Sequence, residues 1–446
     1  MPLMQKVFLV SLGCAKNLVD SEFMLGLVRE KGYGITDDPS CAAIALVNTC
    51  GFIRSAVQES IETILELAQL RQQGFLKRLV VSGCFVQRYG KKLLREIPEV
   101  DAWLGTGQIH RIGEVLEAQD AQSAILLIDK PDFLAEHTAP RVQTTPFYSA
   151  YLKIAEGCSH RCSYCLIPSL RGRLRSRTVD SLHIEAQEMV ERGVKEINLV
   201  AQDTTWYGHD LDPPTTLEDL LQVLVTIQGL QWLRVLYAHP YHITERLLDL
   251  IESEDVLCPY LDIPMQHSNP HVLRAMGRPQ RGESMIRLIE RIRRRSRSIT
   301  LRTTIMVGFP GETDEQFREL YDFVRAAEFN WLGVFSFSPE EGTAAAKLNN
   351  KVDERIVQAR LREIMELQKR ITKRLNQRLV GKTVPVLVEG LNPETDLLLT
   401  GRTATMAPDV DGQVLINEGS ATVGDIVPVR ITEAHPYDLV GGIVKP

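Results

Sequence analysis

Short apolar runs separated by helical stretches dominate the first part of the chain. Three of these runs are rich in β-branched residues and end at a cysteine: VFLVSLGC at Cys14, AIALVNTC at Cys50 and RLVVSGC at Cys84. They predict parallel strands joined by helices. Because the carboxyl ends of parallel strands lie on one edge of a sheet, we expect these three cysteines to converge there. We call them the N-terminal trio.

The same part of the chain contains one strongly periodic helix and then a linker. Apolar residues recur at helical spacing from Ile53 through Leu65 to Ala68, which predicts a helix with one face on the core. The polar stretch PDFLAEHTAPRVQTTP, at 131–146, contains three prolines and indicates a linker. We therefore expect an N-terminal parallel α/β domain over residues 1–140.

Strand-like and helical segments then alternate. The strand-like runs are YLKIA, EINLVA, WLRVLYA, YLDIP, TLRTTIMVG and WLGVFSFS. Six such units predict an α/β fold with a partial (β/α)6 barrel over residues 141–376, ending in a long polar helix near 352–377. Four short apolar runs follow, VPVLVEG, LLLTGRT, QVLIN and IVPVRIT, separated by Gly, Asn, Asp and Pro. They predict a small antiparallel β-barrel over residues 377–446.

The first loop of the predicted (β/α)6 barrel carries the most informative motif. In EGCSHRCSYC, the residues Cys158, Cys162 and Cys165 have the spacing C-x3-C-x2-C. Three thiolates at this spacing can bind one iron–sulfur cluster and leave its fourth iron open. We call these three cysteines the barrel trio. Two trios without an obvious fourth cysteine suggest two clusters, each with one iron that has no protein ligand.

Zinc and simple packing are the alternatives. His160 lies inside the barrel-trio loop and could complete a zinc site of three cysteines and one histidine. Structural zinc usually takes cysteines from paired C-x2-C knuckles, however, and no second pair follows. Packing could explain the N-terminal trio, because free cysteine is among the most buried residue types. We expect the remaining cysteines, Cys41 and Cys258, only to pack.

Polar residues at the other strand ends predict a pocket, because the loops after the strands carry the chemistry in barrels of this kind. These residues are Gln202, Asp203, His239, Gln266, His267, Glu340 and Glu341. We expect His239 and His267 individually to be structural. In the turn VGFPGET, Gly308 and Gly311 allow a close backbone approach and Thr313 can cap the next helix, although an ordinary loop would have the same composition.

Composition narrows the location and the partners. A chain of 446 residues with 44% hydrophobic residues has two or three folded domains. No apolar run approaches transmembrane or signal-peptide form, which predicts a cytoplasmic protein with reduced thiols and no membrane partner. The net charge of −6 does not support a strongly basic nucleic-acid binder. We interpret the basic run ERIRRRSRS, at 290–298, as a solvated helix face.

The motif EGCSHRCSYCLIPSLRGRLRSR, with Tyr164 before its last cysteine, resembles the radical S-adenosylmethionine enzymes. With the N-terminal trio and a C-terminal barrel that looks like a TRAM domain, the whole chain resembles the methylthiotransferases of that group. The resemblance implies a [4Fe-4S] cluster on the barrel trio that binds S-adenosylmethionine, an auxiliary [4Fe-4S] cluster on the N-terminal trio, and an electron donor. It implies no catalytic side chain beyond the cluster ligands.

The resemblance also suggests which residues hold the cofactor or the substrate. Tyr164 would lie against the adenine, although it could simply pack the loop. The other candidates are assigned from their place at strand ends: Gln202, Asp203, Gln266, Gly308 and Gly311.

The implied reaction replaces a hydrogen by a methylthio group at an unactivated carbon, which needs a radical rather than acid–base steps alone. In this reaction a 5′-deoxyadenosyl radical abstracts the hydrogen. The auxiliary cluster then supplies the sulfur, and a second S-adenosylmethionine supplies its methyl group.

Two substrates compete for this reaction. The runs SLGCAKNLVDSE, NTCGFIRSAVQES and SPEEGTAA look like the branch that modifies an aspartate β-carbon of the small-subunit ribosomal protein uS12. The alternative is a tRNA adenosine, whose branch usually reads closer to YGCQMN at the first of these runs.

The charge of the C-terminal segment favours the ribosomal protein. Residues 377–446 contain five Lys or Arg and nine Asp or Glu, a net charge of −4. Such a module should repel RNA phosphates and attract a basic ribosomal protein or the small subunit that contains it, which makes tRNA the weaker candidate. An ordinary acidic surface would have the same composition. A non-enzymatic, metal-containing ribosome-binding protein is the further alternative.

Overall fold

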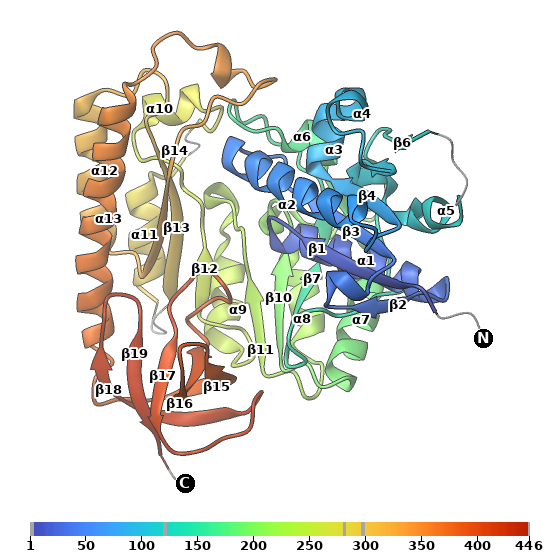
Figure 1. Cartoon of the computed structure of the whole chain (residues 1–446). Helices are drawn as coiled ribbons and strands as arrows, with labels where there is room; N and C mark the ends of the chain where they lie inside the picture. Colours follow the sequence, from blue (N-terminus) through green and yellow to red (C-terminus); the bar gives the residue numbers. More distant parts are fainter. Residues whose placement is uncertain (1–3, 119–122, 280–281, 296–298, 445–446) are drawn as a thin grey trace.

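The computed structural model of the protein describes residues 4–118, 123–279, 282–295 and 299–444. Three units build it: a parallel α/β unit, a partial (β/α)6 barrel and a small closed barrel (Figure 1). Within the described ranges, no helix has the length and apolar character needed to cross a membrane.

The N-terminal unit is a six-stranded parallel sheet in the order β2-β1-β3-β4-β5-β6. Its strands are β1 (Lys6–Ser11), β2 (Gly34–Thr36), β3 (Ile44–Thr49), β4 (Arg78–Gly83), β5 (Ala102–Leu104) and β6 (Ile125–Leu127). The three predicted strands are the neighbours β1, β3 and β4, whose ends pair Ser11 with Asn48 and Thr49 with Gly83. Their carboxyl ends therefore share one edge, as predicted.

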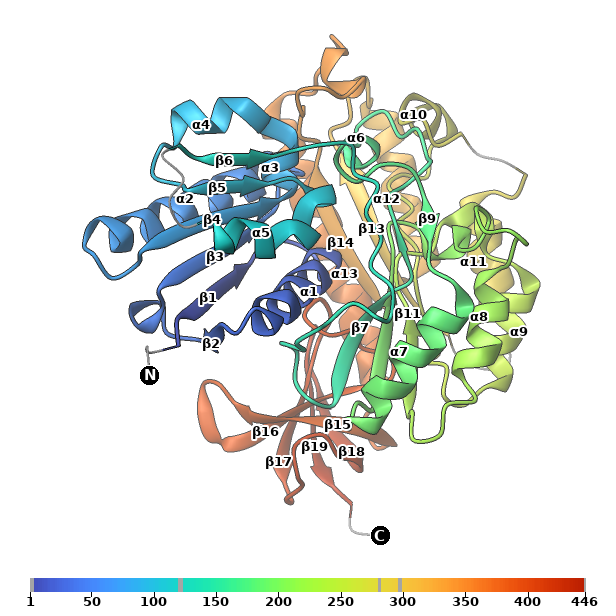
Figure 2. The ribbon, with the colours of Figure 1, turned by 90° about the vertical axis from the view of Figure 1, so that its right-hand side faces the viewer.

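Helices cover both faces of this sheet (Figure 2). They are α1 (Ala15–Glu30), α2 (Arg54–Gln72), α3 (Cys84–Tyr89), α4 (Leu93–Glu96) and α5 (Ile112–Glu117), with 3-10 turns at Pro39–Cys41, Gly90–Lys92 and Thr106–Arg111. Neighbouring residues of β3 point to opposite faces of the sheet. Val47 packs in the hydrophobic cluster that includes residues of α2, and Leu46 packs in the one that includes residues of α1. The predicted helix is α2, but Leu65 is 43% exposed because it lies just past the buried line through Ile64 and Ala68.

The central unit has the six predicted strands in chain order, which form two three-stranded parallel sheets. These strands are β7 (Ser149–Lys153), β10 (Glu196–Val200), β11 (Trp232–Val235), β12 (Tyr260–Asp262), β13 (Thr300–Val307) and β14 (Trp331–Ser336). One parallel bridge, between Leu233 and Leu257, lies between the two sheets. The arrangement is a partial barrel that is open between β14 and β7, as predicted.

Helices follow the barrel strands along the outside of the partial barrel (Figures 1 and 2). They are α7 (Val179–Glu191), α8 (Leu217–Leu224), α9 (Glu245–Ser253), α10 (Pro270–Ala275), α11 (Met285–Arg293), α12 (Asp314–Ala327) and α13 (Glu354–Gln377). Loop elements near the barrel mouth are β8 (Ala155–Glu156), α6 (Ile167–Arg171), β9 (Arg175–Ser176) and the 3-10 turns Thr204–Trp206, Pro240–His242 and Ala345–Lys347. The predicted basic run at 290–298 begins in α11, and its last three residues lie outside the described residues.

The C-terminal unit is a closed five-stranded barrel in the order β15-β16-β17-β19-β18. Its strands are β15 (Thr383–Asn392), β16 (Thr395–Thr403), β17 (Val414–Glu418), β18 (Ile426–Ala434) and β19 (Leu439–Ile443). Four of its five pairings are antiparallel, and β17 pairs with β19 in parallel. The barrel and its first four strands were predicted from the sequence, but β19 was not, because its sequence LVGGI has two glycines and little strand propensity.

The segment at 131–146 has no regular structure, as a linker should, but it is anchored. Arg141 pairs with Glu22 of α1 at 2.5 Å and with Glu185 of α7 at 2.7 Å. A buried arginine that is paired on both sides holds the connection against the two units that it joins.

A buried ion cluster joins the two barrels. Glu196 of β10 is fully buried, and its two carboxylate oxygens accept from Arg234 at 2.9 Å and from Arg402 of β16 at 2.7 Å. Other donors of the two arginines reach backbone carbonyls of the small barrel: Arg234 Nη1 donates to Ala404 O, and Arg402 Nη1 to Met406 O. The Nε of Arg402 also donates to Glu389 at 2.8 Å. Each of these three side chains has a partner of opposite charge, and this pairing offsets the free-energy cost of burying them at the interface.

We expect Glu196→Gln to destabilise the protein by about 3–5 kcal/mol, because it leaves Arg234 buried without its carboxylate and leaves Arg402 with Glu389 alone, at 2.8 Å. Burial alone would raise the pKa of Glu196, but Arg402 and Arg234 outweigh it and hold the pKa well below its ordinary value of 4.5. This stabilisation is present above pH 4.5 and is lost as the pH falls below that value.

Urea denaturation at several pH values tests this prediction. The difference in unfolding free energy between the wild type and the variant should shrink in acid. Glu394→Gln, at an exposed position of the same small barrel, is the matched control and should change stability by less than about 0.5 kcal/mol. Equal effects of the two substitutions would contradict the assignment.

Candidate functional site

The N-terminal trio converges at one edge of the sheet. Cys14 precedes α1, Cys50 follows β3, and Cys84 begins α3 directly after β4. Glycines allow the loops to touch: a Cβ on Gly13 would lie 2.8 Å from the Cβ of Cys50, and a Cβ on Gly51 would lie 2.7 Å from the Cα of Phe85. Any larger residue at these positions would separate the three loops.

Positive charges near the N-terminal trio favour the thiolate form of one of its cysteines, Cys14. Cys14 is open to the surface; desolvation by the surrounding protein would raise its pKa, but the charges of Lys16 and Arg171 lower it overall. Burial raises the pKa of Cys50 to about 11 and also raises that of Cys84. A metal would therefore have to displace protons from Cys50 and Cys84.

The barrel trio lies in the loop after β7 and β8, which backbone hydrogen bonds fold tightly. Cys158 N donates to Gly172 O at 3.0 Å, and Cys165 N donates to Cys162 O at 3.2 Å. The Arg278 guanidinium lies 3.9 Å from Cys162 Sγ. Burial raises the pKa of Cys158 to about 11 and that of Cys165 to about 12.

The spacing of the sulfur atoms argues against a single zinc ion in either trio. Within the described ranges, only His160, Asp203 and His242 form a group whose ligand atoms all lie within 4.8 Å of one another. Two sulfurs on one zinc ion, at about 2.3 Å each, cannot be more than about 4.6 Å apart. The sulfurs of each trio are spread more widely, which fits a cluster that distributes its thiolates over several iron atoms.

The two trios flank the same interface between the N-terminal unit and the barrel. Cys84 packs in one small buried cluster with Leu166 and Leu170, and Leu166 directly follows Cys165. Lys16, two residues after Cys14, places its ammonium 3.3 Å from the ring centre of Tyr237, at the end of β11. Two motifs that are far apart in sequence are therefore brought to one place.

A buried charge network forms the core of this interface. Arg171 is 2% exposed and donates to Asp20 at 2.8 Å, to Glu156 at 3.1 Å and to Asn17 at 3.0 Å. Lys153 contacts Asp20 and donates to Glu156 at 2.8 Å. Burial alone would raise the pKa of Glu156, but Arg171 and Lys153 hold it well below its ordinary range. Glu156, Lys153 and Arg171 therefore stay charged.

Glu340 makes a second connection between the units. Its carboxylate accepts from the Arg88 guanidinium at 2.8 Å and from the Arg54 backbone N–H at 2.9 Å. Arg88 lies in α3, which Cys84 begins, and Arg54 begins α2 soon after Cys50. Glu340, which the sequence placed in the pocket, therefore holds two segments of the N-terminal trio on the barrel.

His160 belongs to a cluster of rings rather than to the barrel trio. Its Nε2 lies 2.6 Å from Asp203 Oδ2, and its ring stacks on that of His239 with centroids 4.5 Å apart. Asp203 also lies 3.2 Å from His242 Nδ1. This group lines a cavity of about 240 Å³ beside Cys162, with Trp206 and Arg278. Asp203 thus organises the histidines of this cavity.

The other residues predicted to contact the cofactor or the substrate have different surroundings in the structure. Gln202 donates to Glu156 at 3.1 Å, and its buried Oε1 has no partner among the described residues, so it can still accept from a ligand. Gln266 is half-buried, lies in the loop after β12, takes a left-handed φ of 68° and forms an isolated parallel bridge with Ile305. Burial raises the pKa of Tyr164, which stays a neutral phenol beside Arg278.

The two glycines of VGFPGET differ in how much space surrounds them. A Cβ on Gly308 would lie 2.4 Å from Val357, so this glycine is needed where α13 packs on the turn. Gly311 has open space around it, and its N–H donates to Asn350 O at 2.6 Å. Thr313 caps α12 in a capping box with Gln316, as predicted.

Arg171, Lys16 and Arg278 were not predicted as site residues from the sequence. The prediction that Cys41 packs in the core was wrong. Arg171 lies in the run RGR that follows the barrel trio, and that cluster of arginines was the available signal. Cys41 does not pack in a core: it is exposed, and its thiol lies 3.2 Å from Asp38 at the 3-10 turn. Cys258 is buried, as expected.

Family comparisons cover the three units. Residues 6–105 match the uncharacterized protein family UPF0004, residues 152–324 match the radical SAM superfamily, and residues 380–444 match the TRAM domain. Among solved structures, the chain resembles the radical S-adenosylmethionine methyltransferase TsrM from Kitasatospora setae, with a TM-score of 0.57, 16% identity and coverage of 77% of this chain and 74% of that one. At this identity the resemblance shows a shared fold.

Curated relatives match almost end to end. The Pelobacter propionicus protein called ribosomal protein uS12 methylthiotransferase RimO is 50% identical over 440 residues, which are 98% of each chain. Its Geobacter sulfurreducens counterpart is 48% identical over 442 residues, or 99% of each chain. The chain therefore belongs to the RimO family of radical S-adenosylmethionine methylthiotransferases.

Proposed function

We propose that this protein methylthiolates the β-carbon of an aspartate in ribosomal protein uS12, by radical S-adenosylmethionine chemistry with two [4Fe-4S] clusters. The observation that carries the proposal is the near-50% identity, over nearly the whole chain, to relatives named for this reaction. The geometry supports it, because both cysteine trios border one interface at the barrel mouth.

Cys158, Cys162 and Cys165 hold the cluster that binds S-adenosylmethionine, and Cys14, Cys50 and Cys84 hold the auxiliary cluster. Bound there, the clusters and S-adenosylmethionine supply the radical, the sulfur and the methyl group that acid–base side chains cannot supply. Arg171 and Lys16 place positive charge beside Cys14 and thereby favour its thiolate. The free Oε1 of Gln202 and the cavity beside Cys162 are available to the cofactor or the substrate.

The three units divide near residues 140 and 376, with the auxiliary-cluster unit first, the radical barrel second and the TRAM barrel third. The acidic TRAM barrel recognises the basic uS12 protein by charge. An external electron donor reduces the barrel cluster, and the reaction takes place in the cytoplasm with reduced thiols.

The substrate is tested by incubating the reconstituted, reduced protein and S-adenosylmethionine with small ribosomal subunits and, separately, with tRNA. We expect mass spectrometry to find a methylthio group on one aspartate of uS12 and none on tRNA. An adduct on tRNA adenosine alone would assign the other branch. Metal binding without release of 5′-deoxyadenosine would indicate a non-enzymatic protein.

Single cysteine substitutions separate the roles of the two trios. Cys162→Ala should abolish cleavage of S-adenosylmethionine, whereas Cys50→Ala should retain cleavage and lose methylthiolation. Each variant should lose about four of about eight irons per chain. Iron content, 5′-deoxyadenosine and modified uS12 are the measurements, and Cys41→Ala is the control that should change none of them. Modified uS12 from either cluster variant would refute these roles.

Glu340→Ala should separate radical generation from sulfur transfer, because it breaks the buried contacts to Arg88 and Arg54 that hold two trio segments on the barrel. We expect S-adenosylmethionine cleavage to persist while methylthiolation falls on the order of 10²-fold, as for a small misplacement of reacting groups. The exposed neighbour Glu341→Ala is the matched control. Equal losses of both activities would mean that Glu340 serves only stability.

A further inference from the structure

The second half of α13 carries a positively charged surface that the reaction does not use. Between Leu367 and Val388 the chain has six Lys or Arg and no Asp or Glu. The six residues are all exposed: Lys369, Arg370, Lys373, Arg374, Arg378 and Lys382. We call these six residues the basic stripe.

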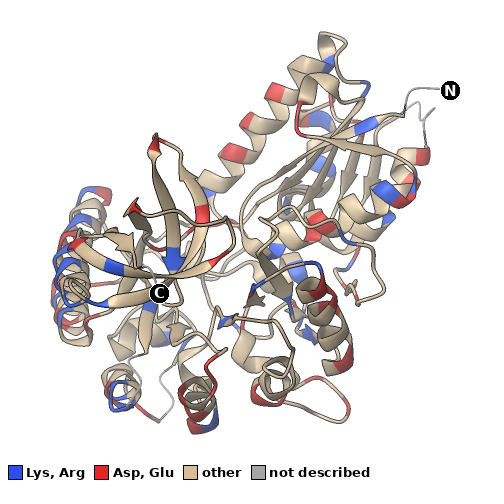
Figure 3. Ribbon diagram, turned by 90° about the horizontal axis from the view of Figure 1, so that it is seen from below, with Lys and Arg blue, Asp and Glu red and all other residues tan. Residues whose placement is uncertain are grey.

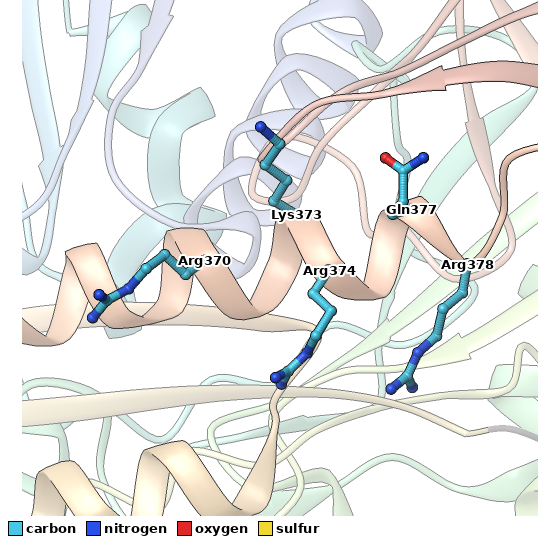
Figure 4. Close-up of a pocket in the computed structure, with 5 residues that line it drawn as sticks. All are labelled: Arg370, Lys373, Arg374, Gln377 and Arg378. Carbon is cyan, nitrogen blue, oxygen red and sulfur yellow. The ribbon is translucent and has the colours of Figure 1, made fainter.

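Helical spacing aligns the stripe. Arg370, Arg374 and Arg378 are four residues apart, so they follow one face over two helical turns, or about 12 Å. Figure 4 shows these three side chains along one edge of the helix, with Lys373 and Gln377 along the other. The five side chains line a shallow hollow of about 470 Å³. The guanidinium groups are thus presented together to the outside.

The fold does little to neutralise this charge. Arg374 pairs with Glu328 at 2.5 Å, and Arg370 donates to the Tyr321 hydroxyl at 3.4 Å. In the part of the chain that the structure describes, no carboxylate lies within 4 Å of the other five basic side chains of the stripe. Like charges four residues apart cost a helix about 0.2–0.5 kcal/mol per pair. An anionic partner would remove this repulsion.

The repulsion extends to the neighbouring helix. Burial lowers the pKa of Arg293, at the end of α11; the charge of Glu328 raises this pKa, and the charge of Arg378 lowers it by a smaller amount. The Arg293 guanidinium is held by backbone carbonyls of Ile299 and Glu328 rather than by a carboxylate. The charge of Arg378 therefore also acts on the neighbouring helix α11.

The small barrel beside the stripe has the opposite charge. The end of α13 is fixed to it by Asn376, whose Nδ2 donates to His435 O at 3.1 Å. Exposed carboxylates on the barrel include Glu394, Asp396, Glu418 and Glu433. Figure 3, a view from below, shows this end of the molecule with both signs of charge. A partner that fits both surfaces must itself offer basic protein and anionic groups.

We propose that the basic stripe binds RNA phosphates of the small ribosomal subunit, so that the protein docks on a ribonucleoprotein rather than on uS12 alone. This inference rests on the proposed function, because a ribosomal-protein substrate brings RNA with it. Arginine donates to phosphate oxygens through a planar fork, and lysine adds point charges. The acidic small barrel then faces basic protein, while the stripe faces the phosphates.

The test compares two triple variants that remove equal charge. The stripe variant carries Arg370→Gln, Lys373→Gln and Arg378→Gln, and it keeps the pair of Arg374 with Glu328. The control variant carries Lys351→Gln, Arg355→Gln and Arg362→Gln, which are exposed positions on or just before the first half of α13. Binding of the holoenzyme variants to purified small subunits and to protein-free small-subunit RNA is measured over a range of KCl concentrations.

We expect the stripe variant to bind both probes at least about ten-fold more weakly, and its slope of log affinity against log salt to fall by about 2–3, one phosphate contact per residue. The control should keep the wild-type slope. Both variants should modify isolated uS12 protein as the wild type does, because the stripe lies outside the reaction site.

Equal weakening in the two variants would mean that only net charge matters, and this would overturn the proposal. Unchanged RNA binding in the stripe variant would overturn it as well, as would stripe-dependent binding to anionic lipid vesicles without binding to RNA. Failure of the proposed function is a separate result: the wild type would then leave uS12 unmodified, whereas the RNA measurement needs no turnover.

Discussion

Burial of Arg171 between the two cysteine trios is the constraint on which the rest of the structure depends. Moving an ion out of water costs several kcal/mol unless partners replace its hydration. Asp20 and Asn17 come from the N-terminal unit, and Glu156 from the barrel, so both units complete the coordination of one guanidinium. Separating the units would take Asp20 and Asn17 away from Arg171 and Asp20 away from Lys153, and this loss opposes separation of the two trios.

This arrangement couples the fold to the chemistry. The same Arg171 that holds the units together also places positive charge near Cys14 and Cys84. Glu340 fixes the helices that follow the other two cysteines of the N-terminal trio. Transfer of a group between the sites of the two trios needs a constant distance between them. Buried charge pairs hold this distance, because partly separating the paired charges costs several kcal/mol.

The charged surfaces for which we propose a docking role lie away from this interface. The small barrel is held on the partial barrel by Glu196 with Arg234 and Arg402, and its exposed surface is acidic. The adjoining half of α13 is basic. Charge on a rigid support steers a large charged partner without altering the reacting groups. The chemistry and the docking can therefore vary independently of each other.

The sequence alone determined the chain order of the six barrel strands, the three units and the convergence of Cys14, Cys50 and Cys84. These features depend on local periodicity and on the rule that parallel strands end at one edge. The spacing of Cys158, Cys162 and Cys165 was equally local. The short strand β19 was not predicted, because its two glycines give it a weak β-strand propensity.

Only the tertiary structure decided which charged side chains pair. Arg171 and Asp20 are 151 residues apart, and Glu340 and Arg54 are 286 apart, so no local pattern links them. The sequence placed Glu340 and Asp203 in a pocket; the fold uses Glu340 to join two units and Asp203 to orient histidines. Such roles depend on which surfaces meet, because a charge is buried only where its partner arrives from another part of the chain.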